Sequence, residues 1–229
     1  MCDNGAIVIF SGGQDSTTCL YWATRRFKKV AALTFDYHQK HLCEIDQSRI
    51  ICEKEGIPQK IISLDFMSEL VRSDLINQAE AKEDSRSDSE LPGTFVPMRN
   101  QLFLTLAYAW GTSIEHYDIV IGVCETDYSG YYDCRDDFIK GFQAFTNLAY
   151  HLNFKIHTPL MDLTKSETFL LAEELGCLES VVELSHSCYR GDRSQRHPWG
   201  YGCGVCLACR LRETGWNQYS TLKEKKNEE

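Results

Sequence analysis

The chain has 229 residues, of which 43% are hydrophobic and 25% are charged, as expected for one globular domain with a small appendage. Its net charge of -9 argues against a general nucleic-acid-binding or membrane-binding surface, because such surfaces need clustered Lys and Arg. No apolar run approaches the roughly 18 residues of a membrane helix, and no signal peptide is recognisable. A cytoplasmic protein is expected, so the eleven cysteines are expected to be thiols or metal ligands rather than disulfides.

Short apolar runs alternate with segments of helical periodicity, which predicts an α/β fold with a Rossmann-like, doubly wound parallel sheet. Strands are expected at 6–10, 30–35, 60–64 and 118–123. Helices are expected at about 15–27, 42–55, 99–113 and 138–152, and from a capping box at 164–167 to a stop at 176. Residues 68–94 interrupt this alternation, and their acidic stretch 80–90 predicts a loop, either a lid or an idle insertion. The last ten or so residues are expected to be a solvated or frayed tail.

The first expected strand runs into a turn that is typical of phosphate binding. This phosphate turn consists of Ser11, Gly12, Gly13, Gln14, Asp15, Ser16 and Thr17. Its glycines let the backbone approach an anion, and the unpaired N–H groups of the next helix point at that anion. The Gly-Lys-Ser/Thr ending of a Walker loop is missing. Ser-Gly-Gly-x-Asp-Ser instead resembles the pyrophosphate loop of enzymes that cleave ATP between its α and β phosphates, so these seven residues are expected to bind ATP. An ordinary strand-to-helix turn is the alternative.

Two basic residues stand where a helix begins, a position that the positive end of the helix dipole disfavours. Arg99 follows Pro97, and Lys165 follows the Thr164 cap. Either could be a harmless surface charge, but two of them in a chain with a phosphate turn favour an anion that compensates both. Because loops at the carboxyl ends of parallel strands meet in one crevice, we expect Arg99 and Lys165 beside the phosphate turn.

Four cysteines near the end of the chain have the spacing of a metal site. This four-cysteine cluster consists of Cys188, Cys203, Cys206 and Cys209. Four thiolates can close a tetrahedral structural zinc site. A redox pair and a [4Fe–4S] cluster are the alternatives, although ferredoxins continue with x-x-x-Cys-Pro, which this chain lacks. His186 and His197 are spare ligand candidates, but exposed loop positions are expected for them.

These motifs belong to a longer ordered set that spans nearly the whole chain. The set consists of 10–17, 34–37, 95–97, Arg99-Asn100, 122–130, 133–135, 158–160, Lys165 with Glu167, and the four cysteines. It resembles the 7-cyano-7-deazaguanine synthases of the queuosine precursor pathway. The resemblance implies an ATP-dependent ligase that adenylates 7-carboxy-7-deazaguanine, releases pyrophosphate, and admits ammonia to give an amide and finally a nitrile. It also implies a homodimer. We expect residues 1–180 to form the ATP-binding domain, and 181–229 the zinc module and tail.

Roles for individual side chains follow from this chemistry. Asp15 is expected to be an indirect partner of a magnesium ion between the phosphates, or else a helix cap. Arg99 and Lys165 are expected to stabilise the charge on the transferred phosphorus, and these three residues form the expected catalytic set. A guanine-like edge donates N–H groups to carboxylates, and its ring stacks on aromatic faces. The expected substrate-binding residues are Asp36, Tyr37, Asn100, Asp127, Tyr128, Tyr131, Asp133 and Arg135. For the segment from Asp127 to Arg135, a tyrosine-rich surface loop is the alternative.

Four positions depart from the family pattern. His38 and Met98 stand where Gly is usual, Tyr132 where Pro is usual, and Lys40 where Arg is usual. Large side chains beside the expected site predict an altered pocket or acceptor access. The acceptor could therefore be ammonia or another amine, such as a protein amino group in a defence-type modification. A zinc-containing nucleotide- or tRNA-binding module is the third hypothesis, and the net charge of -9 disfavours it.

Overall fold

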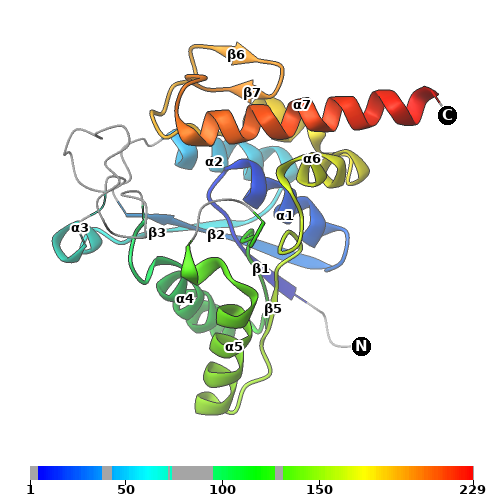
Figure 1. The fold of residues 1–229 in the computed structure, drawn as a ribbon. Helices are drawn as coiled ribbons and strands as arrows, with labels where there is room; N and C mark the ends of the chain where they lie inside the picture. The colour runs from blue at the N-terminus through cyan, green and yellow to red at the C-terminus, as the bar shows by residue number, and fades with distance from the viewer. Residues whose placement is uncertain (1–4, 38–42, 72, 74–94, 127–130, 229) are drawn as a thin grey trace.

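The computed structural model describes residues 5–37, 43–71, 73, 95–126 and 131–228. Five parallel strands form one sheet in the order β3-β2-β1-β4-β5 (Figure 1). Their bounds are β1 (Gly5–Ile9), β2 (Lys29–Asp36), β3 (Gln59–Ser63), β4 (Asp118–Val120) and β5 (Lys155–His157). The order reverses between β1 and β4, which confirms the predicted doubly wound α/β fold and places a crevice at the carboxyl ends of these two strands.

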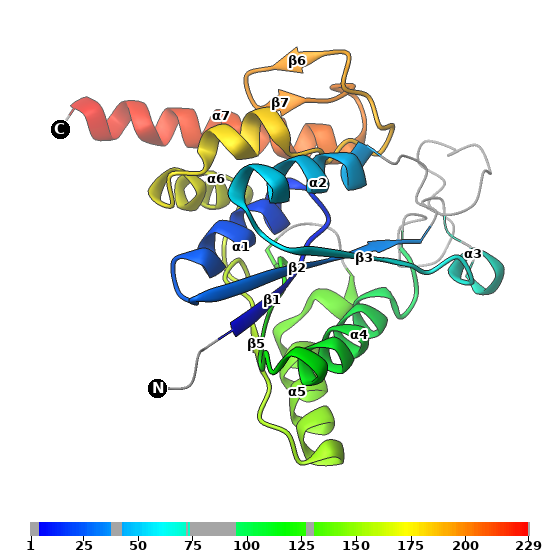
Figure 2. The ribbon, with the colours of Figure 1, turned by 180° about the vertical axis from the view of Figure 1, so that it is seen from behind.

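Helices cover both faces of the sheet, as Figure 2 shows from behind. One face carries α1 (Gln14–Thr24), α2 (Cys43–Glu55), α6 (Lys165–Glu174) and α7 (Leu207–Glu228), and the other carries α4 (Arg99–Ile114) and α5 (Asp136–Tyr150). Alternate residues of β1 serve the two faces, because successive strand side chains point in opposite directions. Ile7 and Ile9 join the core under α4, whereas Ala6 and Val8 join the core under α1.

Smaller elements complete the fold and were not expected. They are α3 (Met67–Leu70), the 3₁₀-helix η1 (Tyr132–Cys134), the π-helix η2 (Ser180–Leu184), and an antiparallel pair, β6 (Arg196–His197) with β7 (Gly200–Tyr201). Strand β5 was also not expected, because only Ile156 of its three residues is buried and so no apolar run marks it. β4 is shorter than the expected strand at 118–123. Most of the expected loop at 68–94 lies outside the described residues.

The end of the chain differs from the expected frayed tail, because α7 continues to Glu228. Its inner face packs on α6: Tyr219 is buried against Phe169, with ring centroids 5.9 Å apart. Lys223 adds an ion pair with Glu173. Helices α6 and α7, which share this core, lie on opposite sides of the predicted domain boundary at residue 180. That boundary stays a prediction. Among the helices of the described segments, none is both long and apolar enough to cross a membrane.

Candidate active site and cysteine cluster

The phosphate turn connects β1 to α1 and is pressed against α2. Gly12 has φ +87°, and a Cβ there would lie 2.5 Å from the Glu44 carbonyl oxygen and 2.8 Å from the Ser48 nitrogen. Only glycine fits such a position, because a side chain would be both strained and in collision with backbone. The Gly12 carbonyl accepts a hydrogen bond from the backbone N–H of His186 at 2.9 Å, which ties the turn to the segment before Cys188.

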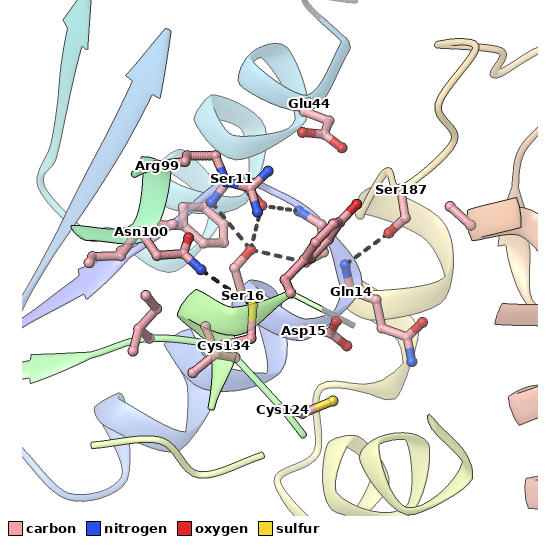
Figure 3. A pocket seen from close by; sticks show the side chains of 18 of the residues that line it. Ser11, Gln14, Asp15, Ser16, Glu44, Arg99, Asn100, Cys124, Cys134 and Ser187 are labelled. Carbon is pink, nitrogen blue, oxygen red and sulfur yellow. Dashed lines mark hydrogen bonds between the residues drawn. The ribbon is translucent and has the colours of Figure 1, made fainter. Parts of the chain in front are cut away.

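Hydroxyl groups occupy the backbone donors of the turn. Ser16 Oγ accepts from the Ser11 N–H at 3.3 Å, and Ser11 Oγ accepts from the Gly13 N–H at 3.2 Å. Ser187 Oγ accepts from the Gln14 N–H at 3.2 Å, as the dashed lines of Figure 3 show. Helix α1 has no side-chain cap bond at Gly13. The turn therefore presents backbone N–H groups at the positive end of a helix. Serine hydroxyls accept from these groups here, and an anion can take the place of the hydroxyls.

A cavity of about 350 Å³ opens beside the turn. Its wall brings together many of the predicted residues: Ser11, Gly13, Gln14, Asp15, Ser16, Tyr37, Arg99, Asn100, Tyr131 and Lys165. Other predicted residues do not line it, namely Gly12, Thr17, Asp36, Asp133 and Arg135. Asp127 and Tyr128 lie outside the described residues. The crevice expected at the carboxyl ends of β1 and β4 is therefore where the predicted phosphate and substrate residues converge.

Lys165 and Asp15 form an ion pair across the phosphate turn. Lys165 Nζ lies 2.8 Å from Asp15 Oδ2, and the two side chains are 17% and 33% exposed. Lys165 begins α6 behind the predicted capping box, in which Thr164 Oγ1 accepts from the Glu167 N–H. Gly215 of α7 lies against the lysine stem, since a Cβ at Gly215 would be 2.7 Å from Lys165 Cβ. Asp15 thus holds a cation at the turn rather than acting as a helix cap.

Arg99 begins α4 and is surrounded by groups that favour its charge. Burial acts to lower the pKa of Arg99, but the nearby Tyr37 and Asp133 raise it overall, so the guanidinium stays charged. Its Cζ lies 6.0 Å from the Tyr131 ring centroid. Asp133 also accepts from the backbone N–H of Asn100 at 3.1 Å. Asp133 therefore fixes the beginning of α4 from outside the cavity, and its expected substrate contact stays a prediction.

Two of the departures from the family pattern can be located. Met98 has φ +63° and is 60% exposed, and Tyr132 is 45% exposed. Neither lines the cavity. The Tyr132 ring instead covers the Arg135 guanidinium, whose Cζ lies 4.7 Å from the ring centroid. The expectation that these two side chains reshape the pocket is therefore not supported. His38 and Lys40 lie outside the described residues.

Four polar residues of the wall carry no motif signal: Glu44, Ser187, Tyr189 and Arg212. Burial raises the pKa of Glu44 to about 7, although Arg99 opposes this shift. Burial also raises the pKa of Tyr189, as it does for Tyr37, so both phenols stay neutral at neutral pH. Ser187 and Tyr189 flank a predicted metal ligand, which is the one signal that could have pointed to them.

The four predicted cysteines lie together, with all four sulfurs within 4.8 Å of one another. The Cys203–Cys209 and Cys206–Cys188 sulfur pairs are each 4.0 Å apart. A tetrahedral zinc site with bonds of about 2.3 Å needs sulfurs about 3.8 Å apart, so the cluster fits a metal. Hydrogen bonds among the thiols lower the pKa of Cys188 and raise the pKa values of Cys206 and Cys209, as expected where one thiolate shares its charge with neighbouring thiols.

The nearby histidines differ from the exposed loop residues that were expected. His186 is fully buried. His197 stacks on Trp199 with ring centroids 4.4 Å apart, and its Nε2 lies 2.9 Å from the Gly202 carbonyl oxygen. Neither belongs to the group of side chains that the described structure brings together for a metal.

A family model described as queuosine biosynthesis protein QueC matches residues 5–220. The chain belongs to the QueC family. Relatives of this QueC chain are similar over nearly their full length. A 7-cyano-7-deazaguanine synthase of Wolinella succinogenes is 49% identical over 216 residues, which are 93% of each chain. A protein of the same name from Alkalilimnicola ehrlichii is 46% identical over 229 residues, which are 95% of each chain.

A solved 4-thiouridine synthetase–RNA complex with bound ATP has a related fold, with a TM-score of 0.51 and 14% sequence identity. The likeness covers 97% of this QueC chain and 53% of that one. At this identity it supports the α/β fold alone. The family predicted from the ordered motifs is confirmed by the full-length relatives.

Proposed function

We propose that this QueC chain is an ATP-dependent carbon–nitrogen ligase that acts on 7-carboxy-7-deazaguanine. ATP transfers AMP to the carboxylate and releases pyrophosphate, and ammonia then displaces AMP to give the amide. A second ATP then adenylates the amide oxygen and releases pyrophosphate, and that oxygen leaves with AMP as the nitrogen loses its protons, which gives 7-cyano-7-deazaguanine. Full-length relatives carry the name of this synthase. The observation that carries the proposal is the convergence of the phosphate turn, Arg99 and Lys165 on one cavity.

Binding of ATP would use the donors of the phosphate turn. When phosphate oxygens arrive, the hydroxyls of Ser11 and Ser187 can rotate away and leave backbone N–H groups for the anion. Lys165 and Arg99 approach the same cavity from the first turns of α6 and α4. Fixed cations around the transferred phosphorus would stabilise the charge that builds there, and a partly enclosed cavity strengthens that interaction.

The deazaguanine ring is proposed to lie against Tyr37 and Tyr131, whose rings line the cavity and offer faces for stacking. Glu44 is the carboxyl group of the described wall best placed to accept N–H donors from a guanine-like edge. Asn100 supports this wall, since its Nδ2 donates to the Asp133 carbonyl oxygen at 3.1 Å. Asp36 and Arg135 would contribute only indirectly.

Two metals fit the described side chains. Asp15 would hold magnesium, because its Oδ1 is buried without a hydrogen-bond partner among the described residues while Oδ2 pairs with Lys165. Such an ion would offset the charge of the ATP phosphates. The four-cysteine cluster would hold a structural zinc, consistent with its sulfur spacing. Metal analysis of the purified chain separates zinc, which is colourless, from a coloured iron–sulfur cluster.

The experiment is a product analysis with ATP, magnesium and the carboxylic acid, with and without ammonium. AMP and pyrophosphate should form only when the acid is present, and ammonium should yield the amide and then the nitrile by mass. Formation of ADP and phosphate, or pyrophosphate release that ignores the acid, would contradict the proposal. A protein whose mass rises by the acyl group would instead establish the amine-conjugation alternative.

A further inference from the structure

Arg212, in the second turn of α7, is a fully buried cation that no motif explains. Its side chain is 1% exposed and lines the same cavity as the phosphate turn. One nitrogen is occupied: Nη2 donates to the Val181 carbonyl oxygen at 2.6 Å and to Ser185 Oγ at 3.0 Å. Nε and Nη1 are buried without a hydrogen-bond partner among the described residues. Half of the guanidinium is thus anchored, and the other half has donors to offer.

The charge of Arg212 is only partly balanced by its surroundings. Burial lowers the pKa of Arg212 to about 10, and Asp15 and Cys209 oppose this shift. Asp15, however, already forms an ion pair with Lys165 at 2.8 Å. An uncompensated buried guanidinium is costly, whereas one that meets an oxyanion forms strong, directed hydrogen bonds. Nε and Nη1 of Arg212 are therefore suited to donate to an oxyanion.

The guanidinium is also fixed in place. A Cβ on Gly200 would lie 2.8 Å from Arg212 Nη2 and 3.3 Å from its Cζ, so the β7 backbone closes one side of the group. A second unpartnered donor lies in the same wall: Gln14 is 3% exposed, and its Nε2 is buried without a hydrogen-bond partner among the described residues. Two side chains with donors that have no partner among the described residues therefore line one cavity, one from each end of the chain.

We propose that Arg212 and Gln14 bind the outer two phosphates of ATP and hold them as pyrophosphate after cleavage. This inference rests on the proposed function for the identity of its anion. The four-cysteine cluster then has a role in the ATP site, because Cys209 lies three residues before Arg212 and Cys188 is adjacent to Ser187. The C-terminal module thereby supplies donors that complete the phosphate turn.

The test is titration of magnesium pyrophosphate, and separately of AMP, into the full-length, metal-loaded chain. Arg212→Gln should weaken pyrophosphate binding by at least about tenfold, because a charge-assisted contact is lost, and should leave AMP affinity within about twofold. Arg193→Gln is the matched control. Arg193 contacts the end of η2, as Arg212 does, and donates to the Glu183, Leu184 and Ser185 carbonyl oxygens. It does not line the cavity. Its pyrophosphate affinity should therefore match that of the wild type.

Equal pyrophosphate affinity in Arg212→Gln and the wild type would overturn the proposal, as would an equal loss in Arg193→Gln. Should Arg212→Gln fail to fold by circular dichroism, Arg212→Lys decides: it keeps a charge but loses the fork, and wild-type affinity in that variant overturns the proposal. The two proposals fail separately. A wild-type chain that binds pyrophosphate but never consumes the carboxylic acid removes the ligase function and leaves this site in place.

Discussion

Replacing Met98 by glycine should stabilise the protein, because Met98 has a backbone conformation that suits glycine. Its φ of +63° and ψ of +9° lie in the left-handed region, immediately before α4 begins. A Cβ in that region costs roughly 1–2 kcal/mol. Glycine loses more backbone entropy on folding, about 0.5–1 kcal/mol, which offsets part of the gain. The side chain is 60% exposed, so its removal sacrifices little burial.

The expected net gain for Met98→Gly therefore lies between about 0 and 1.5 kcal/mol, and its midpoint of about 0.75 kcal/mol corresponds to a melting temperature higher by about 1.5–3 °C for a chain of this size. Met98→Ala is the control that isolates the cause. Alanine removes the thioether but keeps the Cβ in the strained conformation, so its stability should stay close to that of the wild type. Urea unfolding followed by circular dichroism measures both variants. Equal stabilisation by alanine and glycine would refute the reasoning from backbone strain.

The same pair of variants tests what the Met98 departure does to the reaction. Since Met98 does not line the cavity, product identity and turnover should be unchanged in Met98→Gly. A variant that changed the acceptor from one amine to another would show that Met98 acts on the site, contrary to its position in the structure.

Three further predictions concern the site. Lys165→Met should lower the rate of pyrophosphate release by at least about 100-fold without loss of fold. The control Lys140→Met, which removes the exposed ion pair with Asp136 in α5, should release pyrophosphate at the wild-type rate. Equal rates for Lys165→Met and the wild type would show that Lys165 is not part of the site. Cys206→Ser should lose both the metal, measured by elemental analysis, and the affinity for pyrophosphate. Cys177→Ser, at a buried thiol outside the four-cysteine cluster, should keep both properties. If pyrophosphate affinity survives metal loss, the cysteine cluster and the proposed pyrophosphate site are not coupled. Burial raises the pKa of Glu44 from 4.5 to about 7, so between pH 4.5 and 7 the folded chain binds a proton that the unfolded chain has lost. The free energy of unfolding should therefore fall by up to about 3 kcal/mol as the pH rises through this range. Glu44→Gln should flatten the pH dependence of urea unfolding, and an unchanged profile would contradict the raised pKa of Glu44.

Short sequence motifs were sufficient to predict a local structure where the same few residues determine both its backbone geometry and its polar contacts. The phosphate turn could be predicted because Gly12 is needed for a left-handed backbone at a position pressed against α2, and Gly13 directly precedes the first turn of α1. The beginning of α6 could be predicted because the capping box is a four-residue pattern. The shared position of Arg99 and Lys165 followed from a topological rule, since loops after parallel strands converge on one edge of the sheet.

Predictions failed where tertiary packing decides. The last residues of the chain have no apolar run, yet α7 continues to Glu228 because Tyr219 and Lys223 pack on α6. His186 follows no helix or strand pattern, yet it is fully buried where its backbone joins the phosphate turn. In both cases the partner is distant along the chain, so no local periodicity records the contact.

Arg212 shows why the wall of the cavity could not be completed from sequence alone. In sequence it is one of two arginines close behind Cys209, in a helix whose other charges are largely solvated, and nothing local separates it from Arg210. The structure separates them by burial: Arg210 is exposed, whereas Arg212 is buried and donates to the Val181 carbonyl oxygen in η2 and to Ser185 Oγ directly after η2. Arg212 lies three residues after Cys209, so the four-cysteine cluster and this buried side chain share the first two turns of α7. A cluster interpreted as a structural metal site is therefore also in a position to orient the arginine toward the cavity, and Cys206→Ser together with Arg212→Gln distinguishes metal binding from the proposed phosphate contact.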